Sequence, residues 1–267
     1  FLLRRQEREA LVAVRQHLLT DGVRHLYTYG LSQRQDGVPI WCEWFNLTVW
    51  DGEGGITGFL SLVRDVTEST LMSRYIDRMA AFPAEGEDWR QLDHHIEQIR
   101  KVMGADVALA AATDGSRARV LASGSRDGPL GITSYSLAGT PCGELTYTEG
   151  CVYNHNVRDR FPEDELLTHL GVSSYAGVHL RDRSGNPFGV VAIAGHRALG
   201  RPDAVRRTLE HMAGRVALEI ERLEAERETR LAALAFETHE AIMILDRDYR
   251  FVRVNAAFGR ITGYQPG

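Results

Sequence analysis

The sequence YAGVHLRDRSGNPFGVVAIA, residues 175–194, decides the fold of the central part of the chain. Two largely apolar runs, 175–182 and 187–194, flank a turn that contains Ser184, Gly185 and Asn186. Strand-like runs on either side of a turn-forming segment predict a β-hairpin. We therefore expect an antiparallel sheet in this part of the chain.

Upstream of this hairpin, the sequence predicts a second hairpin and a short helix. Residues 106–112 and 117–123 flank the turn Thr113-Asp-Gly-Ser116, which indicates a hairpin. The segment Phe161-Pro-Glu-Asp-Glu165 has a proline and acidic residues where the first turn of a helix favours them. It predicts a short helix that ends at Leu170.

Two longer helices are predicted on either side of these elements, one from Asp88 and one from Pro202. Both contain apolar residues at helical spacing. The two stripes are Trp89, Leu92, Ile96, Ile99 and Met103, and Leu209, Met212, Val216, Ile220 and Leu223. Residues 88–224 are therefore expected to form one α+β domain, an antiparallel sheet with flanking helices.

The first 68 residues predict a smaller sheet. A helix is expected over residues 2–19, and three strand-like runs follow at 23–32, 38–50 and 56–63. The two segments between the runs are rich in turn formers, so an antiparallel meander of three strands is expected. Partial sheets of this kind are predicted at both ends of the chain.

The segment Arg64-Asp-Val-Thr-Glu68 joins the last of these strands to a helical linker, residues 69–87. Asp65 and Glu68 have the spacing of a capping box, and Thr67 lies between them. We predict that the strand passes directly into a helix here. A distortion of the sheet could then be relayed to that helix, so these three residues are candidate relay residues.

A matching junction is predicted near the other end of the chain. After a signalling helix over residues 225–234, two short strands are expected at 242–245 and 251–254 within residues 235–267. Asn255 directly follows the second strand. An asparagine in this position can cap a helix that begins at Ala256.

Three parts of the chain resemble known families. Residues 34–41, Asp51, Gly55, Gly58 and 64–68 resemble the C-terminal half of a PAS domain, with its D-[IV]-T-E terminator. Residues 235–246, 251–258 and 261–264 resemble the N-terminal half of another PAS domain. Between them, the segments 139–144, 161–165, 171–177 and 185–191 resemble GAF domains of bacterial sensors, especially those that precede cyclic di-GMP enzymes.

Composition excludes several classes of function. The formal net charge is -5, with no basic stripe interleaved with aromatic residues, so a nucleic-acid surface is not expected. No apolar run approaches the roughly 20 residues that cross a bilayer, so the segment is expected to be cytoplasmic, without direct membrane contact. No catalytic signature of a known enzyme class is present, so no catalytic residue is assigned.

Several histidines and cysteines are candidates for metal, redox or phosphate sites. Asp93-His94-His95 resembles a phosphoesterase metal motif, but further ligands upstream are missing and adjacent helical residues diverge by about 100°. His211 lacks the context of a kinase phosphoacceptor, and His17, where some PAS domains ligate haem, is expected at the surface. Cys142 and Cys151 could form a redox pair, although burial as free thiols is favoured. No metal is expected, and no cofactor is identified.

The resemblance implies a non-catalytic sensory segment. It would respond to a small molecule or to redox state and act through helical linkers on an output domain outside residues 1–267. Cyclic di-GMP turnover is the output that the resemblance favours, and the alternative is a ligand-free dimerisation scaffold of a histidine kinase or similar protein.

Two homodimer contacts are predicted. One is the helical stripe of Val216, Ile220 and Leu223, which outlasts the domain that it closes. The other is completion of the first half-sheet by residues 235–267, more readily from a second chain than from the same one, because the exposed edge of a sheet recruits strands.

Overall fold

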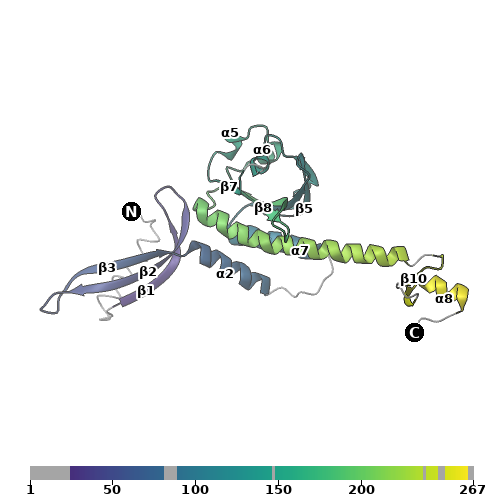
Figure 1. Ribbon diagram of the computed structural model, residues 1–267. Coiled ribbons are helices and arrows are strands. Elements are labelled where there is room, and N and C mark those ends of the chain that lie inside the picture. Colours follow the sequence, from purple (N-terminus) through teal and green to yellow (C-terminus); the bar gives the residue numbers. More distant parts are fainter. Residues whose placement is uncertain (1–24, 81–88, 146–147, 237–238, 246–249, 264–267) are drawn as a thin grey trace. The chain divides into compact units, whose positions relative to one another are not determined.

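The computed structural model describes residues 25–80, 89–145, 148–236, 239–245 and 250–263 (Figure 1). The chain divides into two compact units, residues 1–217 and 218–267. The predicted helix over residues 2–19, with His17, lies outside the described residues. Among the residues described, no helix is both long enough and apolar enough to cross a membrane.

The first described element is a three-stranded sheet. Strands β1 (His25–Gln33), β2 (Pro39–Trp50) and β3 (Ile56–Asp65) pair antiparallel in the order β1-β2-β3, which confirms the predicted meander. In the β2–β3 turn, Asp51 Oδ1 accepts hydrogen bonds from the amides of Glu53 at 3.0 Å and Gly55 at 2.6 Å. The turn formers in the sequence therefore act as expected.

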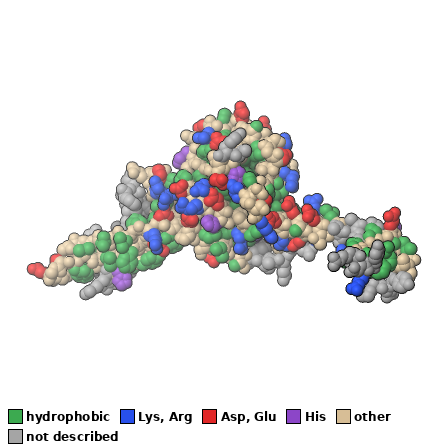
Figure 2. Space-filling model, viewed as in Figure 1, with side chains coloured by type: hydrophobic (Ala, Val, Ile, Leu, Met, Phe, Trp, Pro, Cys, Tyr) green, Lys and Arg blue, Asp and Glu red, His purple; other side chains and the backbone are tan. Residues whose placement is uncertain are grey.

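Much of the apolar surface of this sheet is exposed to solvent. Hydrophobic side chains gather over it in the space-filling view (Figure 2). Those exposed on one face, as the pairing register defines it, are Tyr27, Tyr29, Leu31, Phe45, Val49, Leu60 and Leu62. Contiguous apolar surface of this kind is typical of a face that another element covers.

The central part of the chain forms a six-stranded antiparallel sheet in the order β6-β5-β4-β9-β8-β7. Its strands are β4 (Val107–Thr113), β5 (Arg117–Ser125), β6 (Ser134–Ser136), β7 (Gly150–Tyr153), β8 (Ser174–Arg181) and β9 (Pro187–Gly195). Both predicted hairpins are confirmed, and pairing of β4 with β9 joins them. The edge strands β6 and β7 were not predicted.

Helices cover both faces of this sheet. Side chains alternate between the faces of a strand, and Leu109, Ala111, Val190 and Ala192 point toward an apolar cluster with the short helices α4 (Pro141–Glu144), α5 (Val157–Arg160) and α6 (Glu165–Leu170). On the other side of the domain, α3 (Arg90–Met103) packs against β4 and β5. The α+β fold class is confirmed.

Helix α2 (Thr67–Ala80) follows β3 directly and packs against α3. Its Tyr75 is 2% exposed, and the hydroxyl lies 3.0 Å from His95 Nδ1. Burial raises the pKa of Tyr75 well above its ordinary value. The predicted passage from strand to helix is therefore present, with only Val66 between the two elements.

The helix α7 (Pro202–Phe236) corrects one predicted interface. It runs without interruption through residues 225–234, the segment predicted as a signalling helix. Val216, Ile220 and Leu223 are 0%, 1% and 4% exposed within the single chain. They are core residues, so the dimer seam predicted through them is wrong: the stripe is already covered.

The start of α6 differs from the prediction as well. The helix begins at Glu165, and Asp164 is its N-cap, with Oδ1 accepting from the Leu167 amide at 2.9 Å. Pro162 therefore lies before the helix and not inside its first turn. Asp164, which the sequence places in the first turn, instead caps the N-terminus of the helix.

The second unit contains the C-terminal part of α7 and a small hairpin. Strands β10 (Met243–Leu245) and β11 (Phe251–Val254) pair antiparallel as a separate two-stranded sheet, followed by α8 (Ala256–Thr262). Met243, Ile244, Phe251, Val252 and Ile261 are exposed. The predicted strands are present.

Candidate functional site

The interior between the six-stranded sheet and helices α4 to α6 holds several chemically distinctive side chains. Thr140 caps α4, its Oγ1 accepting from the Gly143 amide at 3.1 Å, and Pro141 occupies the first turn. This defined helix start orients the side chain of the next residue, Cys142. Its side chain is buried in the apolar cluster.

The Cys142 thiol lies between two tyrosine hydroxyls. Its Sγ is 2.9 Å from Tyr175 Oη on β8 and 3.2 Å from Tyr135 Oη on β6. Burial raises the pKa of Cys142, although the two hydroxyls oppose the shift, and burial also raises the pKa of both tyrosines. All three groups therefore stay protonated near neutral pH and form a neutral hydrogen-bonded cluster.

A glycine makes room for this arrangement. Tyr175 and Gly177 lie two residues apart on β8 and so share one face of the strand. A Cβ built at Gly177 would collide with the Tyr175 hydroxyl and ring. The absence of a side chain at Gly177 lets the tyrosine fold over the strand and reach Cys142.

A second group on β7 and α5 lies beside the cluster. Tyr153 Oη donates a hydrogen bond to Glu144, and the Arg160 guanidinium lies 4.8 Å from the centre of the Tyr153 ring and 3.5 Å from the Glu144 carboxylate. Phe161 packs edge-on against Tyr153 with ring centres 5.5 Å apart. These contacts of Arg160 and Glu144 with the two aromatic rings stabilise this side of the domain interior.

Two cavities open beside these residues. One, of about 550 Å³, has Leu137, Cys142, Leu145 and Val190 in its apolar wall and Thr113, His179 and Arg181 among its polar groups. The other, of about 930 Å³, is lined by Tyr135 and by residues around α6. Because Tyr135 is hydrogen-bonded to Cys142, this pair lies between the two cavities.

The thiols are expected to be unreactive in the folded protein. Cys151 Sγ lies 3.9 Å from the Pro141 carbonyl oxygen, and burial raises the pKa of Cys151 to about 12. The thiolate form of Cys151 is therefore scarcely populated at pH 8. We therefore expect a thiol-exchange reagent to modify Cys142 and Cys151 rapidly only after denaturation.

Labelling with such a reagent in buffer and in urea, followed by peptide mass spectrometry, measures this difference. Cys42, which is also buried, serves as an internal comparison. Fast modification of Cys142 or Cys151 in buffer would contradict the expectation and revive the redox-pair interpretation.

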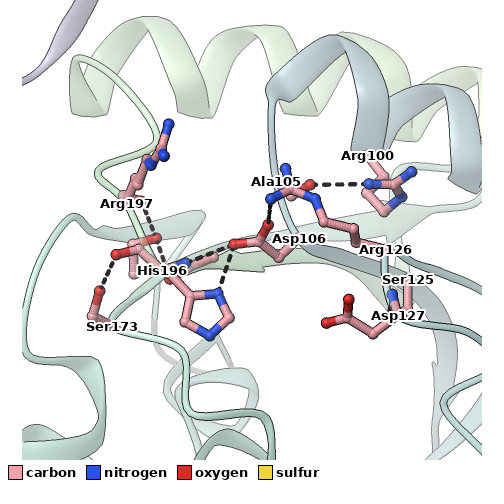
Figure 3. Close-up of polar contacts among 11 residues, drawn as sticks. Arg100, Ala105, Asp106, Ser125, Arg126, Asp127, Ser173, His196 and Arg197 are labelled. Carbon is pink, nitrogen blue, oxygen red and sulfur yellow. Dashed lines mark hydrogen bonds and ion pairs between the residues drawn. The ribbon is translucent and has the colours of Figure 1, made fainter.

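A polar cluster anchors one end of the sheet (Figure 3). Asp106, just before β4, accepts from the His196 amide and from His196 Nδ1, both at 2.8 Å, and pairs with Arg126 at 2.9 Å. Burial alone would raise the pKa of Asp106, but the bonds from His196 and the charge of Arg126 lower it overall. The carboxylate thus ties the start of β4 to the ends of β5 and β9.

The three predicted relay residues at the β3–α2 junction each make a specific contact. Asp65 Oδ1 accepts from the Thr67 amide at 3.0 Å, and Oδ2 pairs with Arg201 at 2.5 Å. The Thr67 hydroxyl accepts from the Trp41 amide at 2.9 Å. Glu68 pairs with Arg207 at 2.8 Å in place of the reciprocal bond of a capping box.

These contacts link the first sheet to the beginning of α7, since Arg201 immediately precedes that helix and Arg207 lies in its second turn. Burial opposes ionisation of Asp65, but the bonds from Thr67 and the guanidinium of Arg201 lower its pKa overall. The spacing in the sequence indicated the turn at Asp65. The arginine partners of Asp65 and Glu68 lie more than a hundred residues away and gave no local signal.

Asn255 lies at the N-terminus of α8. Its Oδ1 accepts from the Phe258 amide at 2.9 Å and from the Ile242 amide at 2.9 Å, and its Nδ2 donates to the Glu240 carbonyl at 2.8 Å. The side chain is 1% exposed. It therefore fixes the helix start and the strand β10 together.

The remaining candidates have local partners. His95 bonds Tyr75, and His211 lies on the exposed side of α7, with Nδ1 2.7 Å from the Arg207 carbonyl oxygen. Tyr135, Tyr175 and Asn154 were missed from the sequence. The only signal for Tyr175 was its position two residues before a glycine inside a predicted strand.

Comparison with known proteins identifies the domains. A family model of the GAF domain matches residues 90–220, and one of the PAS domain matches residues 30–68 and 239–267. No curated protein matches the chain.

Several solved structures are similar to part of the chain. The GAF domain of a phosphoenolpyruvate-protein phosphotransferase from Acinetobacter has 17% identity and a TM-score of 0.46, covering 60% of this chain and 97% of that one. Its counterpart from Coxiella burnetii has 12% identity and a TM-score of 0.46, covering 60% and 96%. The free methionine-R-sulfoxide reductase of Neisseria meningitidis, solved with its substrate, has 17% identity and a TM-score of 0.46, covering 61% and 92%.

The family matches, and not these distant structures, carry the assignment. GAF and PAS domains are sensory modules of signalling proteins. Residues 90–220 are a GAF domain, and residues 30–68 and 239–267 on either side of it belong to PAS domains: the chain is a sensory region of a signalling protein.

Proposed function

We propose that the GAF domain binds a small molecule in its interior and passes the signal to helix α7. The observation that carries this proposal is the pair of cavities on either side of the Tyr135–Cys142 hydrogen bond. Pockets for small molecules combine apolar walls with a few polar groups. The 550 Å³ cavity has this character, with Leu137, Leu145 and Val190 beside His179 and Arg181.

The ligand proposed is a small molecule with an apolar body and a polar or anionic end. The apolar part would lie against β9 and α4, and the polar end would face Arg181 at the rim. Redox sensing by Cys142 and Cys151 is the less favoured input, because burial raises the pKa of both thiols.

The relay proposed uses the junction at Asp65 and Glu68. Their pairs with Arg201 and Arg207 support a mechanical link between the PAS segment at residues 30–68 and the start of α7. Partly exposed ion pairs of this kind contribute little to stability. Their value would lie in fixing the position of one element relative to the other, with Thr67 holding the sheet to α2. Asn255 would have the equivalent role before α8.

The setting proposed is a cytoplasmic bacterial signalling protein that acts as a dimer. The resemblance to regions preceding cyclic di-GMP enzymes favours cyclic di-GMP turnover as the output. The proposed partner surface is the outer edge of β3, completed by residues 235–267 of a second copy. Exposed apolar side chains on both segments, and their common PAS family, support this pairing.

Native mass spectrometry of the full chain, purified without added ligand, tests the input. We expect retained mass beyond the polypeptide, and we expect Val190→Phe, which fills the smaller cavity, to lose it. Val63→Phe, at an exposed position on β3, is the matched control and should keep it. Circular dichroism shows whether each variant folds. An unliganded wild-type chain would favour the alternative, a dimerisation scaffold.

A further inference from the structure

The loop between β9 and α7, residues 196–201, is held almost entirely by side chains from other elements. The His196 amide donates to Asp106 Oδ2 at 2.8 Å, and the His196 carbonyl accepts from the Ser173 hydroxyl at 2.8 Å (Figure 3). The Ser174 hydroxyl lies 2.6 Å from the Arg197 carbonyl oxygen. The loop is therefore positioned from outside, and its geometry depends on where those elements lie.

Asn154 holds the loop close to the start of the helix. Its Oδ1 accepts from the Leu199 amide at 3.0 Å and lies 3.4 Å from the Gly200 amide, and its Nδ2 donates to the Gly200 carbonyl at 2.8 Å. A single side chain thus satisfies both backbone groups of Gly200, two residues before α7 begins. Such a bidentate contact fixes orientation as well as distance.

The residues that hold the loop are chain neighbours of the residues that line the interior. Asn154 follows Tyr153, which packs against Phe161 and bonds Glu144. Ser174 precedes Tyr175, which bonds Cys142. Ser174 and Tyr175 are adjacent in β8 and so point to opposite sides of it, whereas Asn154 directly follows the end of β7. If a change in the interior displaces Tyr153 or Tyr175, the neighbouring residue, Asn154 or Ser174, must therefore move as well.

A third contact brings β7 directly against α7. A Cβ built on Gly150 would come within 3.1 Å of Cγ of Arg206, which lies in the second turn of α7. The β7 strand therefore contacts α7 at Gly150 and holds the preceding loop through Asn154. Both contacts lie on the side of the domain where Cys151 and Tyr153 line the interior.

We infer that the loop of residues 196–201 couples the GAF interior to α7, with Asn154 as the main positioning residue and Ser174 as the second. A rearrangement of the tyrosine–thiol cluster shifts β7 and the start of β8, and their side chains shift the loop and the first turn of the helix. This inference deepens the proposed function, since it specifies how its input would act. It does not depend on which molecule the cavity takes.

Amide hydrogen exchange on the full chain tests the coupling without any ligand. Asn154→Ala should speed exchange at Leu199 and Gly200 by roughly tenfold, the effect of one lost hydrogen bond. Tyr175→Phe removes the bond to Cys142 and should speed exchange at residues 199–206. In the Asn154→Ala background, Tyr175→Phe should add little at those amides. Asn154→Asp, which keeps the acceptor oxygen, should retain part of the response.

The matched control is Asn186→Ala, in the β8–β9 turn at the opposite end of β9, which should leave residues 199–206 unchanged. Three results would overturn the inference: no effect of Tyr175→Phe at these amides, an equal effect with and without Asn154, or a uniform rise over the whole domain. The exchange experiment uses substitutions and no ligand. It can therefore fail while native mass spectrometry still detects a bound molecule, and the reverse is also possible.

Discussion

Val216→Asp is expected to unfold the GAF domain at room temperature, whereas Leu218→Asp, two residues later on the same helix, leaves its melting temperature nearly unchanged. Val216 is 0% exposed and Leu218 is 51% exposed. A carboxylate without a partner in an apolar interior costs several kcal/mol. That is a large part of the 5–15 kcal/mol that stabilises a typical domain.

Circular dichroism melts and sedimentation velocity of both variants measure this difference. The experiment also separates two roles for the stripe. If Val216→Asp stays folded and changes only the association state, then the apolar stripe of Val216, Ile220 and Leu223 forms a dimer interface. The single-chain structure, in which this stripe is buried, would then not be the functional form. Loss of the folded signal assigns it to the core.

Asp106→Ala should lower the free energy of unfolding by about 2–3 kcal/mol, the second largest effect that we expect. The variant loses two hydrogen bonds to His196 and the pair with Arg126, and it leaves the His196 amide without its acceptor. Asp127→Ala, the neighbouring exposed carboxylate, is the matched control and should change stability by less than about 0.5 kcal/mol. Urea denaturation measures both.

The pH dependence of this effect follows from the direction of the pKa shift. The pKa of Asp106 is lower in the folded protein than its ordinary value of 3.8. A carboxylate of this kind contributes fully above its unfolded pKa, and its contribution is lost as the pH falls through the folded pKa. The difference in stability between wild type and Asp106→Ala should therefore shrink as the pH falls below about 4. A difference that grows between about pH 5 and pH 3 would contradict this assignment.

Most of the regular architecture could be predicted because it follows from local patterns. The hairpin at residues 174–195 and the meander at 25–65 both alternate strand-like runs with turn formers, and the structure has them within a few residues of the expected bounds. The missed elements β6, α4, β7 and α5 are only three or four residues long. Elements this short contain at most two periods of a strand pattern and about one helical turn, so periodicity cannot identify them.

The site could be predicted only in part, because its key contacts are distant in sequence. Cys142 was singled out, but its partner Tyr175 is 33 residues away on strand β8. The stripe through Val216 was correctly predicted as apolar, yet a stripe does not indicate whether the same chain or a second chain covers it. Periodicity predicts which face is buried, and only the tertiary structure identifies the partner.

Helix α7 is uninterrupted from Pro202 to Phe236, and this limits the insertions and deletions that it can accept in engineered or related proteins. Residues 224–231 are exposed along the helix, so insertions there leave the buried stripe intact. Each inserted residue advances the helix by 1.5 Å and turns everything after it by about 100°. One added residue would therefore rotate the following part of the chain about the helix axis by about 100°, whereas seven added residues would nearly restore its original orientation. Tolerated length changes in this stretch should cluster near multiples of seven.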